Sequence, residues 1–370
     1  MPFSASRTRF HPSVRLTSLD GVRGLAALMV VLSHVAAMTY APWGGTTPTT
    51  LEFALWHLGA PAVDVFFILS GFVVTQSLLR RPAVLPYLTR RWVRLAPLAY
   101  LAVLLGLLSK PLAELAGSDF SVLVTRDLQA ALTPKDLLGS LTLTFPALNA
   151  NHLNPPLWTL IVELQVALLM PLFAKLSRAW WTLLPVMLIT FVLALLGWTQ
   201  AFFFPAFLLG AILARAEIHL PKSLVLPALL LGLVMLFQRH LTGSDDLFVR
   251  YLAMPGAALI LLSVLNGAGA KLLASDAAQS LGRLSYALYA THFPVMLTVT
   301  ILASNAGHSP LLGALLSLPA CFIIAFVAHA LIERPILDRL DGNQARMPRK
   351  HRSNRRRNVT SPRARGAREA

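Results

Sequence analysis

The sequence predicts an all-α membrane protein, a polytopic bundle of about ten transmembrane helices with both termini in the cytoplasm. Of its 370 residues, 56% are hydrophobic and only 13% are charged, whereas soluble domains carry about 25% charged residues. Apolar runs long enough to cross a bilayer recur from near residue 21 to near residue 332. Lys and Arg concentrate in the segments that this arrangement places inside the cell. No room remains for a separate soluble domain.

Ten apolar runs define the predicted spans, which are residues 21–40, 57–78, 93–109, 156–174, 180–198, 201–215, 223–238, 249–266, 284–303 and 311–332. The fifth and sixth are almost continuous and are interrupted only around residues 197–200. A total of nine spans is therefore the main alternative. Nine spans would place the basic C-terminal tail outside, which the positive-inside rule disfavours.

The two ends of the chain are basic. Residues 1–15 form a predicted cytoplasmic leader without a small-residue cleavage site, residues 16–335 form the membrane domain, and residues 336–370 form a predicted disordered cytoplasmic tail. The net charge is +16, and twelve of the 32 Lys and Arg lie from Arg334 onward. A polybasic segment next to a last span more often fixes topology and contacts anionic lipid than it binds nucleic acid. We therefore expect the bilayer, and no nucleic acid, as partner.

The first span contains Arg23 and His34, which are costly residues for an apolar helix. Eleven residues advance a helix by about 16 Å and by about 1100°, which is about 20° past three full turns. Both side chains therefore project from one face at two depths. A snorkelling Arg and a packed His are the structural alternative. As a pair, they are candidates for lining one functional cavity.

The third span begins with an arginine cluster formed by Arg90, Arg91 and Arg94. Arg91 and Arg94 share a helix face at i and i+3, and Arg90 joins Arg94 at i+4. A planar, permanently charged guanidinium can bind two phosphate oxygens at once, so this cluster suits a phosphate-bearing ligand. Taken alone, such a cluster is more often a positive-inside anchor than a phosphate site.

Two acidic residues and an interfacial aromatic lie on the second and fourth spans. Asp64 stands near the outer end of the second span, where it could pair with a cation or orient an imidazole. Glu163 lies about five residues inside the fourth span and needs a partner or a proton there. Trp158 opens the same span and suits a membrane interface. Gly71 is expected to allow close helix packing.

The ninth span carries a polar stripe made of Ser285, Tyr289 and His292, at i, i+4 and i+7. The stripe can be purely structural, or it can line a substrate path. After the last span, Glu333 and Arg334 are expected to form an interfacial ion pair.

Outside the spans, residues 110–155 form the longest predicted outer loop, which serves either as a lid or as a plain connector. The remaining histidines lack the spacing of metal ligands, so no metal site is predicted.

Four stretches together resemble the bacterial acyltransferase-3 family of integral membrane O-acyltransferases. They are Leu19 to Gly24 with His34, Val63 to Phe72, Arg90 to Pro97, and Leu281 to Pro294. The resemblance covers roughly residues 16–335 and implies ten core spans in the bacterial cytoplasmic membrane. It also implies transfer of an acetyl or other short acyl group to an extracytoplasmic glycan, glycoconjugate or small molecule. This chain resembles the stand-alone form, without a fused soluble hydrolase-like domain.

By this resemblance, activity should depend on Arg23, His34, Arg91 and Arg94. The expected reaction takes an acyl group, most simply acetyl, from cytoplasmic acyl-coenzyme A to a glycan hydroxyl, with no tightly bound cofactor. His34 is the expected general base or covalent carrier. The residues expected to assist are listed by role: Asp64 and Glu163 in catalysis, Arg90 with the coenzyme, and Trp158, Ser285, Tyr289 and His292 along the substrate path.

A different function class also fits the intramembrane polar residues. A transporter or flippase could use His, Asp and Glu as a proton relay and Arg to bind an anionic substrate. Such a protein would move its substrate unmodified and release no coenzyme A.

Overall fold

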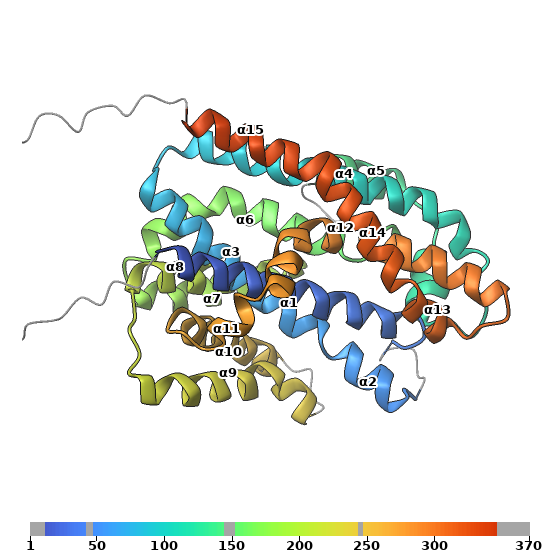
Figure 1. The fold of residues 1–370 in the computed structure, drawn as a ribbon, viewed down its shortest axis with the longest axis horizontal. Helices are drawn as coiled ribbons and strands as arrows, with labels where there is room; N and C mark the ends of the chain where they lie inside the picture. Colours follow the sequence, from blue (N-terminus) through green and yellow to red (C-terminus); the bar gives the residue numbers. More distant parts are fainter. Residues whose placement is uncertain (1–11, 42–46, 144–151, 243–246, 346–370) are drawn as a thin grey trace, which may run out of the picture.

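The structure is a computed structural model that describes residues 12–41, 47–143, 152–242 and 247–345 (Figure 1). Every regular element in these ranges is helical. The elements in chain order are α1 Pro12–Ala37, α2 Thr50–Trp56, α3 Gly59–Arg80, α4 Val84–Ala113, the π-helix η2 Leu123–Leu128, α5 Pro134–Thr142, α6 Leu157–Leu176, the 3₁₀-helix η4 Trp180–Thr182, α7 Leu183–Leu195, the 3₁₀-helix η5 Thr199–Phe203, α8 Phe204–Ala216, α9 Lys222–Thr242, α10 Leu247–Leu265, α11 Ala270–Leu273, α12 Asp276–Asn305, α13 Pro310–Leu316, α14 Leu318–Ala328, the π-helix η6 His329–Glu333 and α15 Arg334–Ala345.

Each of the ten predicted spans falls on an apolar helical segment of the described residues. Seven segments are long and apolar enough to cross a membrane, and the three shorter ones are Trp180–Leu195, Lys222–Gln238 and Arg250–Leu265. The predicted fifth and sixth spans are separate helices, because Gly197 adopts a φ of +101° between them. The all-α multi-pass bundle is confirmed. The number of crossings and the cytoplasmic position of the termini stay predictions.

Two helix pairs bring their backbones into contact through glycines. α1 packs along α12, where a Cβ added to Gly24 would lie 2.5 Å from the backbone nitrogen of Gly282. α3 packs along α8, where a Cβ on Gly71 would collide with the carbonyl of Phe207. The close packing expected of Gly71 is therefore confirmed. Small residues are what allow membrane helices to approach this closely.

The contact at Gly24 predicts a stability effect. Gly24→Ala should destabilise the protein by about 1–3 kcal/mol, because the new methyl group meets backbone that cannot move aside as a flexible side chain would. Gly117→Ala is the matched control, since nothing lies within 4 Å of a Cβ added there. Thermal unfolding of both variants in detergent measures the difference. Equal melting temperatures for the two variants would contradict the backbone contact.

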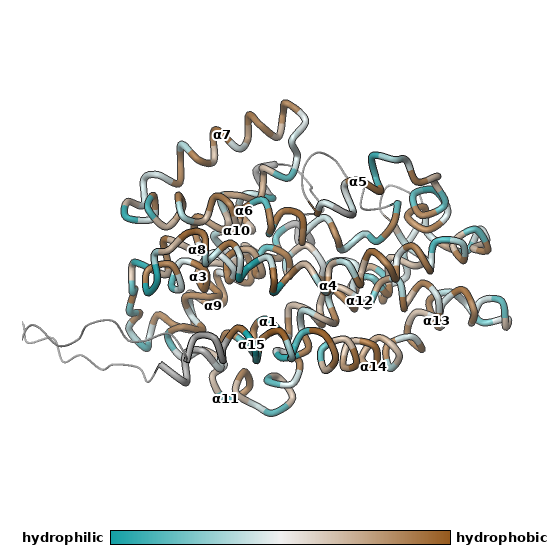
Figure 2. Tube along the Cα trace, turned by 90° about the horizontal axis from the view of Figure 1, so that it is seen from above, coloured by the Kyte–Doolittle hydropathy of each residue, from teal (hydrophilic) through white to brown (hydrophobic). Residues whose placement is uncertain are grey.

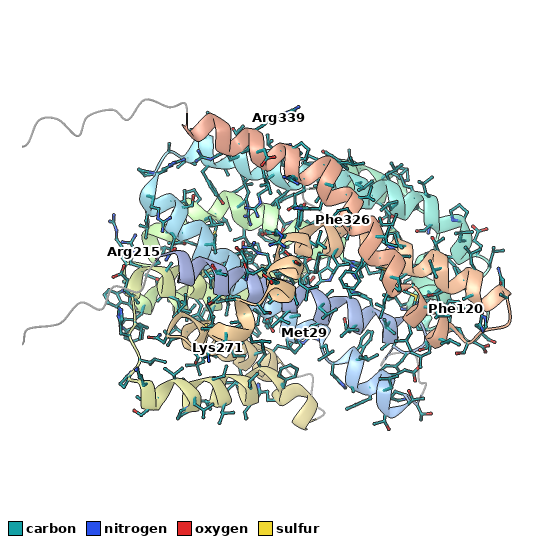
Figure 3. All side chains as sticks on the ribbon, viewed as in Figure 1. Met29, Phe120, Arg215, Lys271, Phe326 and Arg339 are labelled. Carbon is teal, nitrogen blue, oxygen red and sulfur yellow. The ribbon has the colours of Figure 1, made fainter. Side chains whose placement is uncertain are left out.

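Large apolar side chains cover much of the outer surface of the bundle. On α7 alone, Leu184, Leu188, Ile189, Val192 and Leu195 are exposed. Figure 2 shows α7 at the edge of the bundle, with hydrophobic residues along most of its length. Phe326 of α14, labelled in Figure 3, is also exposed. A soluble protein rarely presents apolar surface of this extent, so these faces are those expected to meet lipid.

The predicted long loop begins later than expected and is partly helical. α4 continues to Ala113, and η2 and α5 follow it. Lys110 fastens this segment, because its ammonium donates to the carbonyls of Leu128 at 2.5 Å, Ala130 at 2.7 Å and His152 at 2.9 Å. Phe120 of the segment and Arg215 are labelled at opposite ends of the bundle in Figure 3.

The prediction that Glu333 and Arg334 form an ion pair is wrong. Glu333 is buried and instead accepts a hydrogen bond from His329 at 2.7 Å, while the Arg334 guanidinium lies 3.9 Å from Asp338. Both observed pairs are at i and i+4. Residues four apart share a helix face, whereas adjacent residues point about 100° apart.

Candidate active site

Arg23 and His34 of α1 line two different cavities, not the one cavity that their shared helix face predicts. Arg23 lines one cavity, which we call the arginine cavity, and His34 lines the other, which we call the histidine cavity. The polar residues of the arginine cavity are Arg23, Ser70, Arg91, Arg94, Thr159, Glu163, Ser285, Tyr286 and Tyr289. Those of the histidine cavity are Ser33, His34, Trp56, His57, Asp64, Trp158, Arg250 and Tyr289. Two residues that are eleven positions apart on α1 thus line two adjoining cavities.

Arg91 is held in the arginine cavity by residues of two other helices. Its guanidinium pairs with Glu163 of α6 and donates to the hydroxyl of Ser70 of α3 at 2.8 Å. The Ser70 hydroxyl in turn donates to Glu163 at 3.0 Å. Thr159 and Glu163 are four residues apart on α6, so they stand one turn apart on the same face, and both line this cavity.

The arginine cavity is electropositive. Its lining holds three guanidinium groups and one carboxylate, so three positive charges minus one negative charge leave an excess of two. Asp20 pairs with Arg23 at 3.1 Å but does not line the cavity. Guanidinium groups in this number bind multivalent oxyanions such as phosphates well.

The histidine cavity has a different chemistry, with two imidazoles, one carboxylate, one guanidinium and aromatic walls. Asp64 is 8% exposed and lines it together with His34. Trp158 forms another wall, with its ring 5.0 Å from that of Phe203. Flat apolar walls beside hydrogen-bonding groups suit a ligand that has both hydroxyl groups and apolar faces.

His292 fixes the proton arrangement of His34. The Nδ1 atom of His292 lies 2.9 Å and 3.0 Å from the carbonyls of Leu288 and Tyr289. Carbonyls only accept, so this nitrogen carries the proton, and the Nε2 atom of a neutral His292 is an acceptor. It lies 3.0 Å from Nδ1 of His34.

His34 therefore donates from Nδ1, which is also 3.0 Å from the Val30 carbonyl. Its Nε2 lone pair is left for a ligand in the histidine cavity.

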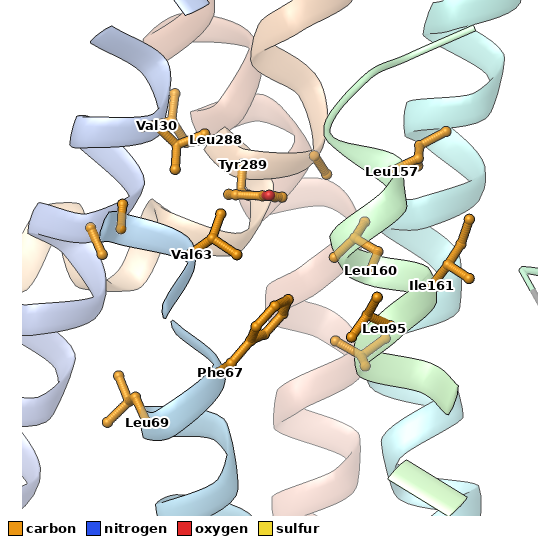
Figure 4. Packing of buried hydrophobic residues seen from close by; sticks show 14 of the residues in the cluster. Val30, Val63, Phe67, Leu69, Leu95, Leu157, Leu160, Ile161, Leu288 and Tyr289 are labelled. Carbon is orange, nitrogen blue, oxygen red and sulfur yellow. The ribbon is translucent and has the colours of Figure 1, made fainter. Parts of the chain in front are cut away.

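Tyr289 and Val63 stand where the two cavities meet, because both residues line both cavities. Thr159 donates to the Pro156 carbonyl at 3.0 Å, so its single hydroxyl proton is committed. The Tyr289 hydroxyl, 2.5 Å from the Thr159 oxygen, must therefore be the donor in that contact. Figure 4 shows Val63 and Tyr289 among the buried residues at this point.

Comparison with known proteins decides the family. The acyltransferase-3 family model, described as an acyltransferase domain, matches residues 16–330. The chain belongs to the acyltransferase-3 family. Acyltransferase MdmB of Streptomyces mycarofaciens is 33% identical over 175 residues, and Nodulation protein 10 of Rhizobium leguminosarum bv. viciae is 26% identical over 190 residues.

These two matches span less than half of each chain, with 45% and 46% of this chain and 43% and 47% of the relatives covered. No solved structure shows a significant match.

This acyltransferase-3 chain brings most of the predicted residues to one of the two cavities. Glu163 is with the arginines and away from the His34 imidazole, while Asp64 shares the histidine cavity with it. His292 is fully buried and lines neither cavity, and Arg90 lines neither. Ser285 and Tyr289 line the arginine cavity, and Trp158 lines the histidine cavity.

Among the site residues that were given no role by sequence reasoning are two that hold other site residues in place. Ser70 bridges Arg91 and Glu163, and Thr159 holds the Tyr289 hydroxyl. The spacing of Ser70 contained a signal, because it lies seven residues after Val63 and so shares its helix face. For Thr159, the equivalent signal is its i, i+4 relation to Glu163.

Proposed function

We propose that the protein is an O-acyltransferase of the bacterial cytoplasmic membrane, with both termini in the cytoplasm. It moves an acyl group, most simply acetyl, from acyl-coenzyme A to a hydroxyl of an extracytoplasmic glycan or glycoconjugate. One observation carries the proposal: an arginine-lined cavity and a histidine-lined cavity adjoin at Val63 and Tyr289. A phosphate-bearing donor in the first cavity and a hydroxyl-bearing acceptor in the second can thus meet where the cavities adjoin.

On the donor side, Arg23, Arg91 and Arg94 hold the phosphates of the coenzyme. The pairing of Arg91 with Glu163 and Ser70 orients its guanidinium before the donor arrives. Such preorganisation lowers the entropy cost of binding.

On the acceptor side, the sugar lies in the histidine cavity against Trp158, and Asp64 accepts hydrogen bonds from its hydroxyls. The attacking hydroxyl gives its proton to Nε2 of His34 while its oxygen bonds to the acyl carbon. The carbon–sulfur bond then breaks, and the proton passes to the departing thiolate to give free coenzyme A. His34 acts as a base in this scheme and needs no covalent acyl intermediate.

The proposal is tested with purified protein, acetyl-coenzyme A and a sugar acceptor. Free thiol released in step with acetylated acceptor, followed by a thiol reagent and mass spectrometry, is the expected result. Movement of unmodified sugar without thiol release would instead establish the transporter alternative. Mass spectra of surface glycans from cells with and without the gene would then name the acceptor by the mass of one acyl group.

The donor site predicts a difference between two neighbouring arginines. Arg94→Ala should raise the KM for acyl-coenzyme A by about 10- to 100-fold, the loss expected when a hydrogen bond to a charged group is removed. Arg90→Ala is the control, because Arg90 is on the same helix but lines neither cavity. Initial rates over a range of donor concentrations measure both. A KM that rises equally in the two variants would contradict this donor site.

A further inference from the structure

The arginine cavity has a charged end and an apolar end. Arg23, Arg91 and Arg94 provide the charge, whereas Val63, Phe66 and Phe67 line the cavity with apolar groups. Val63, Phe66 and Phe67 lie on the first turns of α3. Phe67 is fixed by stacking on Phe207 at a centroid distance of 4.8 Å. A ligand with phosphates at one end and a short hydrocarbon group at the other matches this polarity.

Val63 and Tyr289 form a partition at the apolar end, where the arginine cavity adjoins the histidine cavity. The Tyr289 ring is held at its hydroxyl by Thr159, at 2.5 Å, and on its side by the Phe66 ring, at a centroid distance of 5.5 Å. Val63 is buried opposite it and has one strongly preferred rotamer in a helix. Tyr289 cannot move aside without losing its contacts with Thr159 and Phe66, and Val63 cannot do so without leaving its preferred rotamer.

We propose that Val63 and Tyr289 determine the acyl chain length that the enzyme accepts. This inference rests on the proposed function, since it takes the coenzyme phosphates to lie at the arginines. The acyl group then points at the partition, and its carbonyl must come within reach of the acceptor hydroxyl on the far side. An acetyl group ends at the partition, whereas a longer chain collides with Val63 and holds the carbonyl back.

The size of the side chain at position 63 sets the size of the expected effect. Val63→Ala removes two methyl groups and creates space for about two further carbons of the donor. A pocket discriminates by about 10- to 200-fold for each methylene. The ratio of butyryl to acetyl transfer should therefore rise about tenfold or more in Val63→Ala. Val63→Ile adds a methylene and should lower the ratio of propionyl to acetyl transfer instead.

The experiment measures acceptor acylation by the full-length protein with acetyl-, propionyl- and butyryl-coenzyme A in competition. Val162→Ala is the matched control, because Val162 is fully buried on α6 and lines neither cavity. Opposite shifts in Val63→Ala and Val63→Ile, with the wild-type profile in Val162→Ala, support the inference. If Val63→Ala fails to fold, the shift in Val63→Ile alone decides.

An unchanged chain-length profile in both Val63 variants, with active wild-type protein, would overturn the role of the partition. Wild-type protein that transfers no acyl group from any of the three donors would instead overturn the proposed function. The two failures are therefore distinguishable in one assay.

Discussion

Replacing His34 with Ala should lower kcat/KM for acyl transfer by about 10²- to 10⁴-fold, the usual contribution of a positioned general base. The geometry gives the reason. His292 and the Val30 carbonyl occupy Nδ1 of His34, so Nε2 is the nitrogen that can take the acceptor proton. An Ala side chain leaves the hydroxyl proton without an acceptor at this position. Labelled acetyl transfer in membranes with matched protein levels measures the loss.

His308→Ala is the matched control for this measurement. His308 is exposed, follows the end of α12 and lines neither cavity. It should retain the native rate. A His34→Ala protein that transfers acetyl at the native rate would remove the imidazole from the mechanism.

Replacing His292 with Ala should lower kcat by about 10²-fold with little change in the KM of either substrate. His292 lines neither cavity, so it contacts no substrate and acts only by positioning His34. Without the Nε2 acceptor of His292, only the Val30 carbonyl still holds the proton on Nδ1 of His34, so the tautomer with a free Nε2 lone pair is less populated.

His292→Gln separates positioning from packing. The Gln side-chain oxygen can accept the Nδ1 proton of His34, so this variant should recover part of the lost kcat, whereas His292→Leu should not. Thermal unfolding of the variants reports any packing defect separately. A KM that rises while kcat is unchanged would show instead that His292 contributes to substrate binding.

Much of the fold could be predicted because the membrane imposes a simple rule on the sequence. A span needs about 20 apolar residues, and only helices satisfy the backbone in each one. The apolar runs therefore located all ten apolar helical segments of the described residues. Helix ends were harder, because α4 extends past the apolar stretch to Ala113 and is fastened there by Lys110 to distant carbonyls.

The candidate site was predictable within single helices and unpredictable between them. The eleven-residue spacing of Arg23 and His34 and the three-residue spacing of Arg91 and Arg94 are local and follow from helix geometry. The pairing of His292 with His34 joins residues 258 positions apart. The periodicity of the sequence cannot reveal such a contact, because the contact depends on which helices become neighbours. The pairing of Glu163 with Arg91 was unpredictable for the same reason, because it also joins two separate helices.

The glycine contacts between α1 and α12 and between α3 and α8 restrict how the protein can work. A shift of one residue along either pair would place a side chain where the backbones touch at Gly24 or Gly71. Sliding or rocking of these helices, on which alternating access depends, is therefore opposed by hard contacts. Arg23 and His34 are on one of these interlocked helices. Such a rigid scaffold suits a reaction in which the substrates move and the helices keep their positions.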